Sequence, residues 1–299
     1  MKPELLTPTH WKDYQLIDSG AGRKLERFGP WITSRPEPQA IWNPSLSEAE
    51  WERMAHATFK NRASDDRGEW TCKKGMRPDQ QWFVEYRYGV MALRLRLALT
   101  AFKHVGVFPE QAANWDFLWD KVNALQDAGE QKIRVLNLFA YTGGATLAAR
   151  AAGAEVTHVD AIRQVVAWGK ENMEATGLHD IRWIVDDAMK FVKREVKRGK
   201  QYHGIILDPP AYGRGPDGER WVLDENINEL LAECAKLIPQ HKSFLVLNLY
   251  SMGLSALLAK TAVNQIFGPA PFEQFGELYV SDQHRKNLPL GVCSRFFKA

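Results

Sequence analysis

From residue 134 onward, short apolar runs alternate with amphipathic segments. The apolar runs predict buried strands, and the segments between them carry apolar residues at helical spacing. The expected strands are 135–140, 155–159, 181–185, 204–207 and 243–249. The expected helices are 145–152, 163–175, 188–197, 225–237 and 254–266. This alternation predicts a parallel sheet with helices on both faces.

The end of the chain breaks the alternation. The last two expected strands, 272–280 and 291–297, are joined by a polar loop instead of a helix. We therefore expect them to pair as an antiparallel hairpin at the edge of the sheet. The predicted fold class is α/β, with a seven-stranded, Rossmann-like, mostly parallel sheet that ends in this hairpin.

The first hundred residues follow a different pattern. Strands are expected at 14–17, 24–28, 31–33, 70–73, 82–87 and 90–97, with one helix at 45–59. Met91, Leu93 and Leu95 alternate with other residues, as in a half-buried strand. We expect a small α+β domain at 1–103, which is a candidate for contact with RNA or another substrate. A ligand-binding domain is expected at 104–299.

Residues 134–160 carry the clearest ligand signal. Gly143 and Gly144 follow the first strand of the large domain, and its second strand ends on Asp160. A glycine turn lets the backbone approach a ligand, and an acid at this strand end can accept hydrogen bonds from ribose hydroxyls. The spacing is not GxGxxG, so it favours a nucleoside without pyrophosphate, such as S-adenosylmethionine. The alternative is the ordinary glycine turn of any doubly wound protein.

Acids also follow the next two strands. Asp187 follows the third strand, the sequence DPP at 208–210 follows the fourth, and Tyr212 comes shortly after. The carboxyl ends of parallel strands meet at one edge, so these residues are expected to converge with Asp160. The two prolines stiffen the backbone and leave carbonyls open for a flat substrate base near Tyr212. A rigid turn without a ligand is the alternative.

Composition narrows the class of protein. Hydrophobic content of 45% and charged content of 25% are typical of a soluble globular protein. The net charge of +3 permits a nucleic-acid partner without requiring one. Cys72, Cys234 and Cys293 form no CxxC, so a cytoplasmic, reducing location and no metal site are expected. The most apolar stretch, 90–102, is interrupted by two arginines, so no membrane span is expected.

Four motifs occur in order: NLFAYTGG at 137–144, VDA at 159–161, VDDAMKF at 185–191 and DPPAYGRG at 208–215. Together they resemble class I S-adenosylmethionine-dependent RNA methyltransferases. The closest resemblance is to bacterial large-subunit (23S) ribosomal RNA enzymes that modify cytosine C5 or guanine N7. The seven strands with a terminal hairpin also match the methyltransferase layout. The small first domain resembles the central domain of these enzymes, and we expect their N-terminal PUA domain to be absent.

The resemblance implies that S-adenosylmethionine is the cofactor. It places Asp160 at the ribose, Ala161 under the adenine, and Asp187 and Ala188 at the adenine edge. The loop after the first strand would line the methionine part, and the join GVFPEQ would fold back on the cofactor. The implied cofactor-binding residues are Phe108, Gln111, Asn137, Phe139, Tyr141, Thr142, Gly143, Asp160, Ala161, Asp187, Ala188 and Asp208.

The catalytic residues that the resemblance implies are Asp208, Pro209 and Tyr212. Cytosine-C5 enzymes need a cysteine thiolate that adds to ring carbon C6. Here neither the Pro-Pro turn nor residues 248–252 contain a cysteine, which leaves Cys293 as a poor candidate. The expected reaction is therefore attack by a nitrogen or oxygen lone pair on the sulfonium methyl, oriented by Asp208 and the Pro209 carbonyl.

The expected function is methylation of a ribosomal RNA base without a cysteine adduct. Two alternatives stay open: a methyltransferase that acts on a protein or small molecule, and a non-catalytic protein that binds RNA or cofactor. For RNA contact, loop cations near the strand ends are better candidates than the basic run at 190–200, where a solvated helix face is expected. These loop cations are Arg214, Arg220, His284, Arg285 and Lys286. The sequence does not indicate an oligomeric state.

Overall fold

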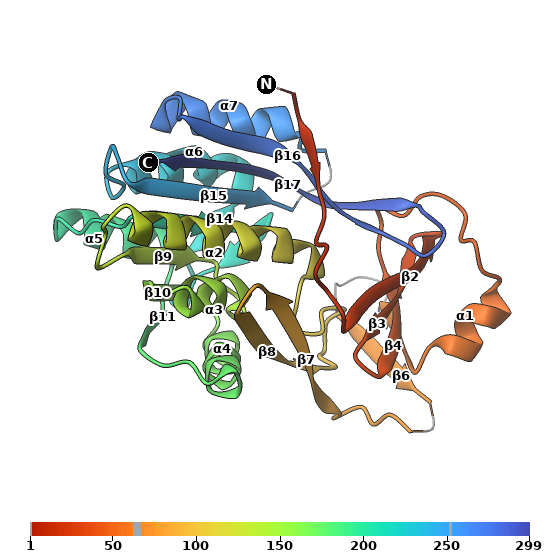
Figure 1. Ribbon diagram of the computed structural model, residues 1–299. Helices are drawn as coiled ribbons and strands as arrows, with labels where there is room; N and C mark the ends of the chain where they lie inside the picture. The colour runs from red at the N-terminus through yellow and green to blue at the C-terminus, as the bar shows by residue number, and fades with distance from the viewer. Residues whose placement is uncertain (1, 62–66, 74, 251–252) are drawn as a thin grey trace. The chain divides into compact units, whose positions relative to one another are not determined.

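The computed structural model describes residues 2–61, 67–73, 75–250 and 253–299 (Figure 1). The chain divides into two compact units. Unit 1 comprises the chain up to Leu6, Gln111–Leu278 and Gly291–Ala299. Unit 2 comprises Thr7–Glu110 and Tyr279–Leu290. The sequence suggested a single boundary after residue 103, whereas each unit here is assembled from separate segments of the chain.

Unit 1 is built around an eight-stranded sheet. Its strands are β1 (Glu4–Leu6), β9 (Arg134–Leu138), β10 (Glu155–Asp160), β11 (Ile181–Val185), β12 (Gly204–Leu207), β15 (Ser243–Leu249), β16 (Phe272–Ser281) and β17 (Asn287–Lys298). Their order across the sheet is β1-β16-β17-β15-β12-β9-β10-β11. Strands β15, β12, β9, β10 and β11 pair in parallel, and β17 pairs antiparallel with β15. The predicted α/β fold with a mostly parallel sheet is confirmed.

The edge of this sheet differs from the prediction. β16 and β17 lie inside the sheet, and the edge strand is β1, which pairs in parallel with β16. Gly276 of β16 faces the backbone of Glu4, where a Cβ atom would collide with it. Three residues are too few to show an alternating pattern, so β1 could not be recognised from local periodicity.

Helices cover both faces of the sheet (Figure 1). One face carries α2 (Ala112–Asp127), α3 (Gly144–Ala151) and α4 (Arg163–Thr176). The other face carries α5 (Ala188–Lys197), α6 (Leu223–Ala235) and α7 (Ala256–Phe267). Because strand side chains alternate, Val135 packs toward the first group and Leu136 toward the second. Burial on both faces explains the nearly continuous apolar runs of the parallel strands.

A short antiparallel pair, β13 (Tyr212–Arg214) and β14 (Arg220–Val222), follows β12 in the chain. It joins the Pro-Pro turn to α6, so it belongs to the same edge of the sheet. None of the helices in the described part of the chain has the length and apolar character that a bilayer crossing requires.

Unit 2 contains a five-stranded sheet and a two-stranded pair. The sheet contains β2 (Tyr14–Gly20), β3 (Arg23–Phe28), β4 (Trp31–Pro36), β5 (Ala57–Asn61) and β6 (Gly68–Cys72), in that order. The pair is β7 (Gln81–Tyr88) with β8 (Met91–Ala98), and the helical pieces are α1 (Glu48–Met54) and the 3-10 turn η1 (Pro109–Gln111).

The helix predicted at 45–59 is wrong at its second half. α1 begins after Ser47, which forms a reciprocal capping box with Glu50, and it ends at Met54. The following residues, Ala57–Asn61, form β5 and pair with β4 and β6. Pairing with strands on both sides overrides the local helical pattern.

Unit 2 buries a network of charged groups. Arg35 Nε donates to Glu26 Oε2 at 2.6 Å, and Lys24 pairs with Glu37 at 3.2 Å. Lys286, expected as an RNA contact, instead donates to Asp18 Oδ1 at 2.7 Å. Its ammonium is therefore engaged in the internal structure of unit 2.

Candidate active site

The carboxyl ends of β9, β10, β11 and β12 meet at one edge of unit 1. The strand order reverses beside β9: the chain continues to β10 and β11 on one side and later to β12 and β15 on the other. Ligands of open α/β sheets bind at such a switch point. The loop after β9 and the turn after β12 border it.

The loop after β9 has an unusual backbone. Phe139 and Tyr141 have φ angles of 55° and 49°, in the left-handed region, and Gly143 has φ of 90°. Large residues in this region cost roughly 1–3 kcal/mol each and occur mainly where function requires them. The Tyr141 N–H donates to Asp160 Oδ2 at 2.9 Å, so the loop is tied to the end of β10. This strained loop is the shape expected of a ligand cradle.

Asp160 suits the ribose of a nucleoside. Its Oδ1 accepts from the Ile162 N–H and its Oδ2 from the Tyr141 N–H, both at 2.9 Å. A carboxylate has about four acceptor positions, so Asp160 keeps capacity for a ribose hydroxyl beside its backbone bonds. Burial raises the pKa of Asp160, and the backbone bonds counter that effect. Asp187 lies after β11, where its Oδ1 caps α5 by accepting from the Lys190 N–H at 2.8 Å.

Asp208 is held by two amides. Asn248 Nδ2 donates to its Oδ1 at 2.6 Å, and Gln111 Nε2 donates to its Oδ2 at 3.3 Å. Asn114 Nδ2 in turn donates to Gln111 Oε1 at 2.9 Å, which fixes the glutamine. Burial raises the pKa of Asp208 to about 6, although the Asn248 bond opposes the shift. A carboxylate with a pKa near neutrality is suited to proton transfer.

Sequence reasoning missed Asn248. It lies near the end of β15, in the run Ser243–Leu249, where every residue is buried. A single amide at the carboxyl end of an apolar strand was a usable signal, because a buried polar side chain needs a partner. The Asn248 Oδ1 atom is buried without a hydrogen bond from the described residues, which leaves an open acceptor beside Asp208.

The Pro-Pro turn is anchored by a tryptophan. Trp221 Nε1 donates to the Pro210 carbonyl at 2.7 Å, and its ring lies 4.8 Å from the Phe139 ring. The Pro209 carbonyl accepts no hydrogen bond from the described residues, so the open carbonyl expected from sequence is found only there. Tyr212 is 79% exposed, which leaves its ring available to a substrate base.

The Asn137 side chain is held inside the protein. Its Nδ2 donates to Thr146 Oγ1 at 2.9 Å, and Thr146 Oγ1 lies 3.0 Å from His158 Nδ1. Burial lowers the pKa of His158 to about 3, so the imidazole is neutral. The Asn137 side chain therefore orders the interior between β9, β10 and α3.

The other implied cofactor residues are placed as follows. Thr142 is buried, and its carbonyl accepts from Asn172 Nδ2 at 2.9 Å. Ala161 follows Asp160 at the edge and is half-buried. Ala188 packs in the hydrophobic core, so only its backbone is available. Phe108 belongs to unit 2.

None of the three cysteines is poised as a nucleophile. Burial raises the pKa of Cys293 to about 11, and its Sγ donates to Asn114 Oδ1 at 3.3 Å. Burial also raises the pKa of Cys72 and of Cys234. A neutral thiol is a weak nucleophile at neutral pH. Within the described residues, no group of three His, Cys, Asp or Glu side chains is placed to hold a metal ion.

The fold and this edge define an open α/β protein whose ligand edge lies at the carboxyl ends of its parallel strands. A family model for S-adenosylmethionine-dependent methyltransferases matches residues 54–270. The chain belongs to this family, and its cofactor is S-adenosylmethionine. Asp160 and the strained loop after β9 fit that nucleoside.

Individual proteins agree with this assignment. The crystal structure of the SAM-dependent methyltransferase from Agrobacterium tumefaciens is 37% identical, with a TM-score of 0.89 over 99% of this chain and 93% of that one. Ribosomal RNA large subunit methyltransferase K/L of Shewanella frigidimarina is 29% identical over 149 residues, 48% of this chain and 20% of that protein. Ribosomal RNA large subunit methyltransferase I of Klebsiella pneumoniae is 33% identical over 82 residues, 26% of this chain and 20% of that protein. The matched part spans about a fifth of the length of these two curated relatives.

Proposed function

We propose that this methyltransferase modifies a base of ribosomal RNA, in the cytoplasm, at a nitrogen or oxygen lone pair and without a cysteine adduct. The observation that carries the proposal is the Asp208 carboxylate, held by two amides beside the open Pro209 carbonyl. The neutral thiols support a mechanism without covalent attack. The relatives named as ribosomal RNA large subunit methyltransferases favour RNA over a protein or small molecule.

Bound S-adenosylmethionine supplies an electrophilic methyl group. Asp160 accepts hydrogen bonds from the ribose hydroxyls. The backbone of the loop 139–143 lines the methionine part, while Ala161, Asp187 and the Ala188 backbone border the adenine. These contacts use acceptors that the described protein groups leave open.

Asp208 orients the target and takes its proton. Its carboxylate accepts a hydrogen bond from an N–H or O–H of the base, and the Pro209 carbonyl accepts a second. The lone pair of that atom would attack the methyl group that the bound cofactor supplies, and Asp208 would take the proton that the methylated atom releases. Tyr212 stacks on the base, since an exposed ring can hold an unpaired base flat.

Transfer of labelled methyl groups tests the substrate. The full chain with labelled S-adenosylmethionine is incubated separately with total RNA and with total protein from cells that lack the enzyme. Label in ribosomal RNA is expected, and mass spectrometry of its nucleosides identifies the modified base. Label confined to protein would replace the proposal with that alternative. Absence of turnover on every substrate would favour the non-catalytic one.

Two variants test the site. Asp160→Ala is expected to lose most of its affinity for S-adenosylhomocysteine in calorimetry. Asp208→Asn should retain that affinity and lose turnover, because Asp208 serves the target. Unchanged binding in Asp160→Ala would refute the cofactor assignment of that residue.

A further inference from the structure

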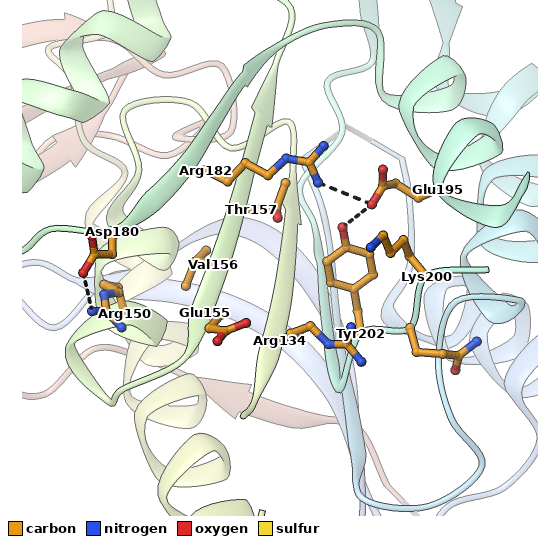
Figure 2. A pocket seen from close by; sticks show the side chains of 11 residues that line it. Arg134, Arg150, Glu155, Val156, Thr157, Asp180, Arg182, Glu195, Lys200 and Tyr202 are labelled. Carbon is orange, nitrogen blue, oxygen red and sulfur yellow. Dashed lines mark hydrogen bonds and ion pairs between the residues drawn. The ribbon is translucent and has the colours of Figure 1, made fainter. Parts of the chain in front are cut away.

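A pocket of about 560 Å³ lies in unit 1 at the amino-terminal ends of the parallel strands, opposite the candidate active site (Figure 2). Strands β9, β10 and β11 contribute Arg134, Thr157 and Arg182. These residues share one face of the sheet, because they are paired in register or alternate along a strand. Glu195 at the end of α5 and Tyr202 just before β12 complete the wall that Figure 2 shows.

The buried acid of this pocket already has its partners. Glu195 accepts from the Tyr202 hydroxyl at 2.7 Å and from Arg198 Nη1 at 2.9 Å. Arg182 Nη1 lies farther away, at 3.5 Å, and its side chain is 47% exposed. Arg198 therefore balances the charge of Glu195 at closer range than Arg182 does, and the half-exposed Arg182 guanidinium keeps other donors for a ligand.

The other cations of the pocket are not paired with a buried carboxylate. Arg134 and Lys200 make no side-chain hydrogen bond or ion pair with any described residue. Arg150 donates to the carbonyls of His179 at 2.8 Å and Ala154 at 3.2 Å, which fixes its guanidinium without neutralising it. These positive charges surround the pocket. They are solvated by water or balanced by an anion that is not part of the described protein.

Two further acids belong to the rim. Asp180 has a side chain that is 76% exposed and lies 3.7 Å from Arg150, and Glu155 is also exposed. Water and salt screen exposed pairs of this kind. The rim acids consequently weaken the positive potential of the interior only in part.

The basic run along α5 divides into two groups. Lys190, Lys193 and Arg194 at its beginning each pair with a carboxylate of the protein. Lys197 and Lys200 have no such carboxylate partner among the described residues, and Lys200 lines the pocket. Part of the unpaired positive charge of this run therefore lies at the pocket.

We propose that this pocket, with Arg134, Arg182 and Lys200, binds phosphodiester groups of the RNA backbone at a distance from the methylated base. The inference rests on the proposed RNA substrate. The cations are spread around the pocket and so match successive phosphates better than one small anion. The Tyr202 ring is buried and its hydroxyl is engaged, so the pocket offers no exposed ring for stacking a base.

The separation of the two sites sets a minimum length for the RNA. Strand β10 has six residues, which span about 20 Å at roughly 3.3 Å per residue. At the rise of about 3.4 Å per nucleotide of one strand of a stacked duplex, bridging the two edges takes about six nucleotides. A stacked tetranucleotide is therefore too short to occupy both sites.

RNA binding by the full chain tests the pocket. Affinity is measured by fluorescence anisotropy over a salt series, with fluorescein-labelled fragments of ribosomal RNA of about 40 nucleotides and with tetranucleotides. The double variant Arg134→Ala, Lys200→Ala is expected to bind the long fragments roughly tenfold more weakly at about 0.1 M salt, and its salt slope should be smaller by about 1–2. Binding of tetranucleotides should change much less.

Lys193→Ala, Lys236→Ala is the matched control. It also removes two positive charges, but both lysines are paired with glutamates at 2.6 Å and lie outside the pocket. Its salt slope should stay close to that of the wild type, and Arg134→Lys should retain most of the binding. Unchanged S-adenosylhomocysteine affinity in each variant confirms that unit 1 is folded.

The outcomes separate this inference from the proposed function. If RNA is methylated but the pocket variant keeps its salt slope, or loses no more than the control, the inference is overturned and the proposed function stands. If RNA binding depends on the pocket but the label enters protein, the inference stands and the proposed function falls. If the wild type binds no RNA, both fall.

Discussion

Replacing Asp208 by asparagine should make the stability of the protein less dependent on pH and should remove most of its activity. Burial raises the pKa of this carboxyl from 3.8 to about 6, so folding disfavours its ionised form. A shift of about 2 units corresponds to roughly 3 kcal/mol. Because the folded state holds the proton more tightly, the protein loses stability through this group as the pH rises from about 4 to about 6.

Asp208→Asn removes this titration. Relative to the wild type, the variant should gain about 1.4 kcal/mol of unfolding free energy between about pH 5 and about pH 7.5. The amide offers one oxygen where Asn248 and Gln111 both donate, and the unmatched donor costs about 1–3 kcal/mol at either pH. The change with pH is therefore the diagnostic quantity.

The activity of the wild type should rise with pH over the range in which its stability falls. The wild-type kcat/KM should fall below about pH 6, because a protonated Asp208 cannot accept the proton of the target. The kcat of Asp208→Asn at neutral pH should be lower by about 10²- to 10⁴-fold.

Both quantities are measured on the full chain. Urea unfolding followed by circular dichroism gives the free energies without cofactor, and labelled methyl incorporation into RNA gives the rates. Asp160→Asn replaces a second carboxylate at the same edge. In that background, Asp208→Asn should still cause the same pH-dependent change in unfolding free energy. A variant-minus-wild-type free energy that is the same at both pH values, together with a flat pH–rate profile, would refute the reasoning.

Three further changes test other parts of the chain. Glu26→Gln breaks the buried pair with Arg35 and should destabilise the protein by about 3–5 kcal/mol, measured as a lower urea midpoint. Gly144→Ala places a Cβ 2.8 Å from Trp115 Cε2, so we expect a loss of about 1–3 kcal/mol and weaker S-adenosylhomocysteine binding in calorimetry. Cys293→Ala should keep its kcat within about twofold, because the protonated thiol takes no part. Loss of turnover in that variant would restore a cysteine mechanism.

The sequence by itself determined the class of the protein. Alternating apolar runs and amphipathic segments follow local periodicity, so the parallel strands β9, β10, β11, β12 and β15 and the helices between them were predictable with small errors at their ends. The short strands β13 and β14 were not predicted. The acids Asp160, Asp187 and Asp208 stand at strand ends, where parallel topology brings them to one edge. The motif series also agrees with the family assignment.

Only the tertiary structure decided how these parts pair. β1 is three residues long and pairs with β16, near the other end of the chain. β5 was hidden in a helical pattern and forms because it pairs with β4 and β6 on its two sides. Asn248 and Asp208 are 40 positions apart, so no local pattern could reveal their bond or the raised pKa. The cations beside α5 also look alike in sequence, and their carboxylate partners decide which are free to bind a ligand. Periodicity records what each segment buries, whereas hydrogen bonds and charge pairing depend on which segments meet.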